Sequence, residues 1–142
     1  MKESATGSGF GGRWHQGFLA HAMVIHKRLD RRRPKFIIGH SLGAAAAQFL
    51  SLLWRVPAIG FAAPRLHAGG REVDNDRLCL CLWRKDDPVG SFPGDTFRHV
   101  GKSIRLDKNK STGLLNHSLR HYKASMANAH NRSVLPQAWP AA

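Results

Sequence analysis

The sequence predicts an α/β fold, in which helices flank a β-sheet. Short apolar runs with β-branched or alternating residues are typical of strands. These runs alternate along the chain with longer segments whose apolar residues recur every three or four positions, as in helices. A chain of 142 residues, 42% hydrophobic and 22% charged, has the length and composition of one globular domain with its own core. Strands that alternate with helices predict at least one right-handed parallel crossover.

The first predicted element is a helix over residues 14–29. Its apolar positions lie three or four residues apart and form one face: Trp14, Phe18, Ala22, Ile25 and Leu29. Pro34 closes the polar stretch after this helix, because the residue before a proline disfavours the helical conformation. Residues 1–13 are polar and glycine-rich, and we expect a flexible lead there.

The middle of the chain holds three predicted strands and a second helix. Residues 35–39 and 57–62 are short apolar runs, which we expect to form buried strands. Between them, residues 42–54 are rich in Ala and Leu, which favour a helix. Residues 64–76 are loop-like, and residues 77–83 alternate most clearly as a strand.

The last third of the chain begins with a long loop over residues 85–95, which contain two prolines and two glycines. Residues 97–106 alternate like an outer strand, and a polar turn at 107–112 leads to a helix over 115–126. The chain therefore divides into three parts: a lead (1–13), an α/β domain (14–127) and a C-terminal tail (128–142).

The charge balance is strongly basic, with 22 Lys and Arg against 9 Asp and Glu and a formal net charge of +13. Such a surface attracts polyanions. The densest cluster contains Lys27, Arg28, Arg31, Arg32, Arg33 and Lys35. It is expected either as a solvated helix end, where cations complement the helix dipole, or as a basic face that docks on an anionic membrane. Nucleic acid is not expected as a partner, because no nucleic-acid-binding motif is present.

The cysteines and the apolar segments give information on the cellular compartment of the protein. Cys79 and Cys81 alternate with leucines in a predicted strand, so both thiols point to one face. A disulfide between them is geometrically poor, and we expect reduced packing residues, which suit the cytoplasm. No secretory signal is visible, and residues 42–54 are too short to span a bilayer. No metal-binding motif or phosphate loop appears, so neither a metal nor another cofactor is expected.

The motif that carries chemistry is G-x-S-x-G over residues 39–43. It ends a predicted strand and begins a predicted helix, which is the context that lifts a nucleophilic serine above a sheet. We interpret Ser41 as that nucleophile. The alternative is a glycine-flanked turn in which the serine only caps the helix.

A serine hydroxyl needs a base to remove its proton, and the base needs a carboxylate to hold it. In this fold the three groups follow in the order Ser, Asp, His, and Ser41, Asp87 and His117 satisfy that order. The rivals for the acid and the base are Asp86, Asp95, His99 and His121. The N–H of Leu42, directly after the serine, is the expected first donor of an oxyanion hole.

Several stretches of the sequence resemble the class 3 lipase family, the α/β-hydrolases that include the fungal triacylglycerol lipases. The matching stretches are W-H-Q-G-F (14–18), I-G-H-S-L-G-A (38–44), G-F-A-A-P-R (60–65), D-P-V-G-S-F-P (87–93), F-R-H-V-G (97–101) and H-S-L with Tyr122 (117–122). The resemblance covers residues 14–122. It implies Ser41 as nucleophile, Asp87 as acid and His117 as base, whereas His99 falls on a position that is not catalytic.

The resemblance also implies a substrate class and a difference from the family. Family members cleave acylglycerols or similar lipid esters through an acyl-enzyme. They carry an earlier strand with an oxyanion turn and then a lid helix, which would precede Trp14 and do not appear in this sequence. We therefore expect a truncated α/β-hydrolase-like sheet flanked by helices. The alternatives are a catalytically impaired hydrolase fragment, a thioesterase or peptidase on the same fold, and a basic membrane- or nucleic-acid-binding module.

Overall fold

The computed structural model describes residues 12–29, 31–69, 73–108 and 116–140. The elements follow one another in this order: β1 (Arg13–Trp14), α1 (Gln16–Leu29), β2 (Ile37–His40), α2 (Leu42–Trp54), β3 (Ala58–Phe61), β4 (His67–Ala68), η1 (Asp76–Leu78), β5 (Cys79–Arg84), η2 (Pro88–Ser91), β6 (Lys102–Leu106), α3 (Leu119–Ala127) and α4 (Ala129–Val134). Most of the predicted lead and of the predicted turn at 107–112 lies outside the described residues.

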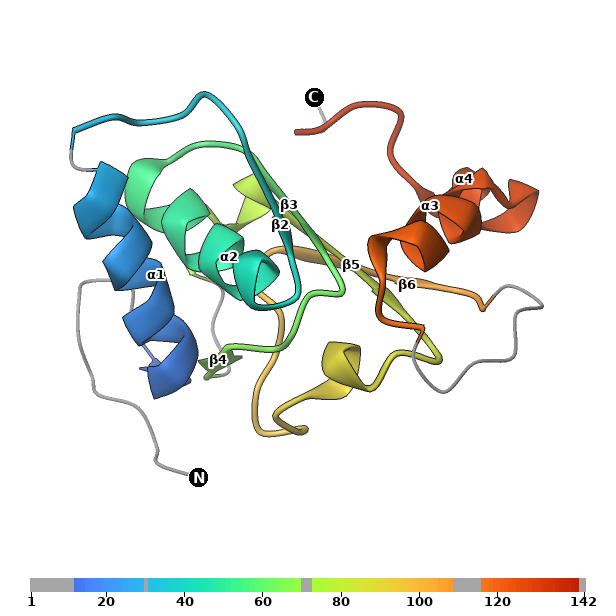
Figure 1. Ribbon diagram of the computed structural model, residues 1–142, viewed down its shortest axis with the longest axis horizontal. Coiled ribbons are helices and arrows are strands. Elements are labelled where there is room, and N and C mark those ends of the chain that lie inside the picture. Colours follow the sequence, from blue (N-terminus) through green and yellow to red (C-terminus); the bar gives the residue numbers. More distant parts are fainter. Residues whose placement is uncertain (1–11, 30, 70–72, 109–115, 141–142) are drawn as a thin grey trace.

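The central sheet has four parallel strands in the order β2-β3-β5-β6, beside a small antiparallel pair of β1 and β4. β2 and β3 pair from Ile37↔Ala58 to His40↔Phe61, and α2 forms the crossover between them. The predicted α/β fold is confirmed. Because the strands are parallel, their carboxyl ends share one edge of the sheet, where the segments that follow β2 and β5 come together (Figure 1).

Helices cover both faces of this sheet (Figure 1). α1 and α2 pack on one face, and the core there includes Phe49, Cys79 and Cys81. α3 and the C-terminal segment pack on the other face, around a smaller core that includes Leu80 and Tyr122. Successive residues of β5 therefore enter opposite cores, as expected for a strand buried on both sides.

Both cysteines are free and fully buried, with their Sγ atoms 4.0 Å apart. Burial raises the pKa of the Cys81 thiol, and the neighbouring Cys79 raises it further. The Cys81 thiol therefore stays protonated, and both side chains pack in the core between β5 and α2, as the sequence predicted. No helix in the described part of the chain is both long and apolar enough to cross a membrane.

The first helix begins two residues later than predicted. Trp14 belongs to β1, where it pairs with His67 of β4. Its indole is fully buried and meets Phe49 edge-on, with ring centroids 5.4 Å apart. The spacing of Trp14 imitates one more helical turn, but burial of the indole between β4 and α2 holds an extended backbone. β4 itself lies within the stretch 64–76, which was predicted as loop.

The last strand is shorter than the predicted range of 97–106. Before β6, the backbone of Arg98 exchanges hydrogen bonds with that of His67, at N···O distances of 2.8 and 3.2 Å. Gly101 then has a φ of 78° and turns the chain. Pairing with β5 begins only at Lys102. The alternating residues 97–106 therefore contribute to two structures: Arg98 bridges to β4, and only the residues from Lys102 onward join the central sheet.

The stretch 128–142, predicted as a tail, contains helix α4. Asn128 caps this helix by accepting a hydrogen bond from the N–H of His130 at 2.9 Å. Asn131 is buried and accepts a hydrogen bond from the N–H of Asp107 at 2.8 Å. α3 begins at Leu119, whereas the predicted start at residue 115 lies outside the described residues. α4 is thus held by the polar contacts of Asn128 and Asn131, which apolar periodicity does not detect.

Candidate active site

Ser41 lies on a sharp turn between β2 and α2. Its φ of 56° and ψ of −120° place a non-glycine residue in a sparsely populated backbone region. The turn is held because the Ser41 carbonyl accepts hydrogen bonds from the N–H groups of Ala44 and Ala45, at 2.9 and 3.1 Å. The Ser41 N–H donates to the carbonyl of Phe61 at 3.0 Å. The strand–turn–helix context predicted for the motif is therefore present.

The two glycines of the motif have different roles. A Cβ at Gly39 would lie 2.2 Å from the carbonyl oxygen of Gly43, so only glycine fits at this position. A Cβ at Gly43 would meet nothing within 4 Å. A missing Cβ therefore makes room for the close strand–helix contact at Gly39 only, whereas at Gly43 it is the backbone that Gly39 approaches.

The structure brings Ser41, His117 and Asp87 together. Ser41 Oγ lies 2.7 Å from His117 Nε2, and His117 Nδ1 lies 2.9 Å from Asp87 Oδ2. A carboxylate only accepts, so the Nδ1–H of His117 donates to Asp87 and the neutral Nε2 accepts the proton of the Ser41 hydroxyl. An imidazole in this position can remove the serine proton while the carboxylate stabilises the resulting imidazolium.

Asp87 is fixed by two further donors. The N–H of Val89 donates to Oδ1 at 3.0 Å, and the Tyr122 hydroxyl donates to Oδ2 at 2.8 Å. Tyr122 is fully buried and accepts a hydrogen bond from the Arg84 N–H at 3.1 Å. Burial, together with the hydrogen bond and the charge of Asp87, raises the pKa of Tyr122 well above its usual range. Tyr122 therefore stays protonated as a donor, a role that the sequence analysis did not assign to it.

Asp86, the first rival for the acid, points to different partners. It accepts hydrogen bonds from Arg84 Nε and Nη2 at 2.9 and 2.8 Å, and one from Asn116 Nδ2. Burial alone raises the pKa of Asp86, but the hydrogen bonds and positive charge of Arg84, with the donor of Asn116, hold it below its usual value. Asp86 is thus a charged partner of Arg84, and His117 faces Asp87 instead.

The remaining rivals lie in other surroundings. Asp95 is exposed and pairs with Arg65. His99 is buried, with Nε2 at 2.7 Å from the Ala63 carbonyl and Nδ1 at 3.1 Å from the Ser103 hydroxyl, and burial lowers its pKa to about 4. His121 contributes only its backbone to the neighbouring network, where its carbonyl accepts from Arg84. None of the three is hydrogen-bonded to Ser41 or Asp87 in the described residues.

Two neighbouring groups complete the surroundings of Ser41 and His117. Leu42 is the first residue of α2, so its N–H has no acceptor within the helix and remains available as a donor beside Ser41. His40 Nε2 lies 2.6 Å from the carbonyl oxygen of His117 and therefore donates to it. Sequence analysis assigned no role to His40, although it stands inside the motif.

Exposed apolar side chains flank the three groups. Leu42 follows Ser41, Phe92 lies in the loop after Asp87, and Leu119 follows His117; each is about half exposed, at 46, 49 and 52%. The Phe92 ring also lies 6.0 Å from that of Phe18 at the start of α1. An exposed leucine or phenylalanine is common on its own, but each of these three lies close in sequence to one of the three groups, and together we call them the apolar rim.

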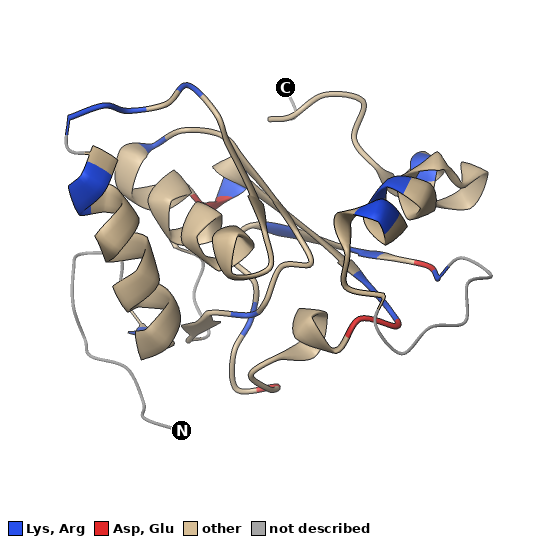
Figure 2. Cartoon of the chain, in the orientation of Figure 1, with Lys and Arg blue, Asp and Glu red and all other residues tan. Residues whose placement is uncertain are grey.

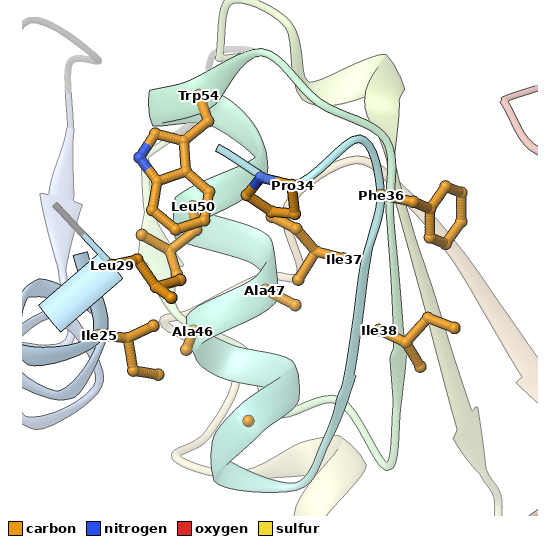
Figure 3. A pocket seen from close by; sticks show the side chains of 11 residues that line it. Ile25, Leu29, Pro34, Phe36, Ile37, Ile38, Ala46, Ala47, Leu50 and Trp54 are labelled. Carbon is orange, nitrogen blue, oxygen red and sulfur yellow. The ribbon is translucent and has the colours of Figure 1, made fainter. Parts of the chain in front are cut away.

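A separate apolar groove of about 300 Å³ lies on the outer side of β2, between α1 and α2 (Figure 3). The residues that line it include Ile25, Leu29, Ile38 and Trp54, but not Ser41, Asp87 or His117. Within the described residues, no three His, Cys, Asp or Glu side chains are placed to hold a metal ion.

Comparison with known proteins shows the fold and no closer relationship. No protein-family model matches the chain, and no curated protein matches its sequence. Three fungal lipases of known structure are similar: lipase II from Rhizopus niveus (TM-score 0.55, 17% identity, 75% of this chain and 49% of that one); Lip2 lipase from Yarrowia lipolytica (0.50, 17%, 73% and 46%); and the lipase from Rhizopus microsporus var. chinensis (0.53, 18%, 79% and 47%).

These similarities establish a lipase-like α/β fold. The chain spans just under half the length of each of the three lipases. Identity of 17 to 18% carries no information on activity or substrate, so any function depends on the chemistry of the site itself.

Proposed function

We propose that this protein is a serine hydrolase that cleaves carboxylic esters with apolar acyl groups, of the acylglycerol type, through an acyl-enzyme. The observation that carries the proposal is the continuous hydrogen-bonded chain of Ser41 Oγ, His117 and Asp87, with separations of 2.7 and 2.9 Å. The strained backbone of Ser41 supports it, because strain of this kind concentrates at functional sites.

The reaction has two halves. In the first, Ser41 Oγ attacks the ester carbonyl carbon as its proton passes to His117 Nε2, and the Leu42 N–H donates to the oxyanion. His117 then gives that proton to the departing alkoxide, which leaves as an alcohol. In the second half, His117 takes a proton from water, the hydroxide attacks the acyl carbon, and the proton returns to Ser41 Oγ as the carboxylic acid leaves.

The apolar rim supports the choice of substrate. Leu42, Phe92 and Leu119 are exposed and follow Ser41, Asp87 and His117 along the chain, and an acyl chain that covered them would remove apolar surface from water. Each buried methylene contributes about 0.8 kcal/mol. Esters with longer acyl chains are therefore expected to have a lower KM than acetate esters.

The decisive experiment measures both turnover and labelling. We expect the protein to hydrolyse p-nitrophenyl butyrate and to react with an alkyl phosphonate probe at Ser41. Ser41→Ala should lower kcat at least about 10⁴-fold and prevent labelling. Equal rates in the two proteins would refute the proposal. Labelling of Ser41 without turnover would instead identify an activated serine in a catalytically impaired hydrolase.

A further inference from the structure

Next to the proposed Ser41–His117–Asp87 chain lies a second network that the reaction does not use. Its centre is Arg84, the last residue of β5, whose side chain is fully buried. The guanidinium binds both carboxylate oxygens of Asp86, at 2.9 and 2.8 Å, and its Nη1 donates to the His121 carbonyl of α3 at 2.9 Å. Asp86 also accepts a hydrogen bond from Asn116.

The two networks connect neighbouring residues of the same two segments. Asp86 and Asp87 are consecutive, and so are their partners Asn116 and His117. The same two short segments are therefore joined twice, once through the pair that holds the imidazole and once through the pair beside it. Arg84 adds a third connection, from β5 to the first turn of the helix that follows His117.

The surroundings of Asn116 indicate that its position is not set by packing alone. Asn116 is 3% exposed, yet its Oδ1 is buried without a hydrogen-bond partner in the described residues, while Nδ2 is bonded to Asp86. Rotating the amide by 180° would turn Oδ1 toward a carboxylate, so the orientation is fixed. Buried unpaired polar atoms are rare in proteins, and each calls for an explanation.

We propose that Arg84, Asp86 and Asn116 form a positioning unit that sets the place of the His117 imidazole between Ser41 and Asp87. The proposal depends on the proposed function, because it assigns a role for His117 in the reaction. The unit touches neither the hydroxyl of Ser41 nor the carboxylate of Asp87. It fixes the backbone on each side of the His117–Asp87 hydrogen bond, at Asp86 in the turn after β5 and at Asn116 and His121 on the opposing segment.

The test compares two buried asparagines. Asn116→Ala removes the donor to Asp86, whereas Asn131→Ala removes an equally buried amide that ties α4 to Asp107 and Ser125, away from the site. Both variants are expected to lower Tm. Only Asn116→Ala is expected to lower kcat, by about ten- to a hundred-fold with little change in KM, because a displacement of about 1 Å at a reacting group can cost about a hundred-fold in rate.

A second measurement does not depend on turnover. The Nδ1–H of His117 should give a downfield proton resonance, because it is held by a buried carboxylate. We expect this resonance to broaden or disappear through faster exchange in Asn116→Ala and to persist in Asn131→Ala. A kcat within twofold of the parent in Asn116→Ala, or equal losses in both variants, would overturn the positioning role. If the parent protein hydrolyses no ester, the proposed function fails, while the resonance still tests whether Asn116 holds His117.

Discussion

The two ends of strand β2 differ in almost every respect. At its carboxyl end, His40 and Ser41 enter a network of hydrogen bonds that reaches Asp87, Tyr122 and His117. At its amino end, the connection from α1 carries four exposed cations: Arg31, Arg32, Arg33 and Lys35. No ion pair between described residues involves them. Figure 2 shows these cations on the connection, far from the acidic pair that follows β5.

The excess of positive charge is the most conspicuous feature of the composition, but the proposed chemistry does not depend on it. The net charge is +13, and most of the lysines and arginines among the described residues are exposed, where water and salt screen their charge. The site has few charges, but they are paired and largely buried, where an electrostatic interaction is much stronger. A membrane bound by the cations at the amino end of β2 would face the end of the sheet opposite Ser41.

The largest effect is expected at the carboxyl end, from the two histidines near the start of α3. His117→Ala should lower kcat for p-nitrophenyl butyrate at least about 10⁴-fold, because in the described part of the chain only His117 places a base against Ser41 Oγ. His121→Ala, one helical turn away, is the matched control and should change kcat less than about threefold, since only its backbone carbonyl joins the network. Comparable losses in both variants would contradict the assignment of the base.

A smaller effect, on stability, separates the two glycines of the motif. Gly39→Ala places a Cβ 2.2 Å from the Gly43 carbonyl oxygen, and overpacking of this kind lowers the free energy of unfolding by about 1–3 kcal/mol. Gly43→Ala meets no atom within 4 Å, and it should raise that free energy by up to about 1 kcal/mol because alanine favours a helix. Urea unfolding measures both, and a larger loss in Gly43→Ala would show that the turn is not built as described.

The smallest effect on turnover is expected at the amino end. Replacing Arg31, Arg32, Arg33 and Lys35 by Gln should leave kcat for a soluble ester within about twofold. The same change should weaken retention on vesicles of phosphatidylserine and phosphatidylcholine, by about 1 kcal/mol for each cation that lies at the surface. Sedimentation over a range of salt concentrations measures this, with pure phosphatidylcholine vesicles as control. Unchanged retention would exclude these cations as a membrane-docking surface.

Much of the fold was predictable because it depends on local pattern. The apolar runs that became β2, β3 and β5 and the Ala-rich segment of α2 lie within one or two residues of their predicted limits. Two of the errors have a common cause. Trp14 pairs with His67 in the small sheet, and Arg98 forms a bridge to the same residue, and no nearby residue in the sequence signals a partner that lies more than thirty positions away.

The proposed site was likewise predictable only in part. The motif placed Ser41, and the order of acid and base left Asp86, Asp95, His99 and His121 as rivals to Asp87 and His117. The structure separates adjacent acids because each carboxylate faces a different neighbour: Asp86 meets Arg84, while Asp87 meets His117 and Tyr122. Tyr122 belonged to a matching stretch of sequence, but its contact with Asp87 required the folded chain.

The sequence by itself determined the α/β alternation, the turn at Ser41 and the basic surface, because each depends on residues close together along the chain. Tertiary structure alone decided which histidine meets Ser41, which carboxylate meets that histidine, and how Gln48 is satisfied. Gln48 is a polar side chain in an apolar helix, and it bonds the carbonyl of Pro64 and the N–H of Val100. Hydrogen bonds between distant segments depend on angstrom-scale placement by the packed sheet and helices, which local periodicity does not encode.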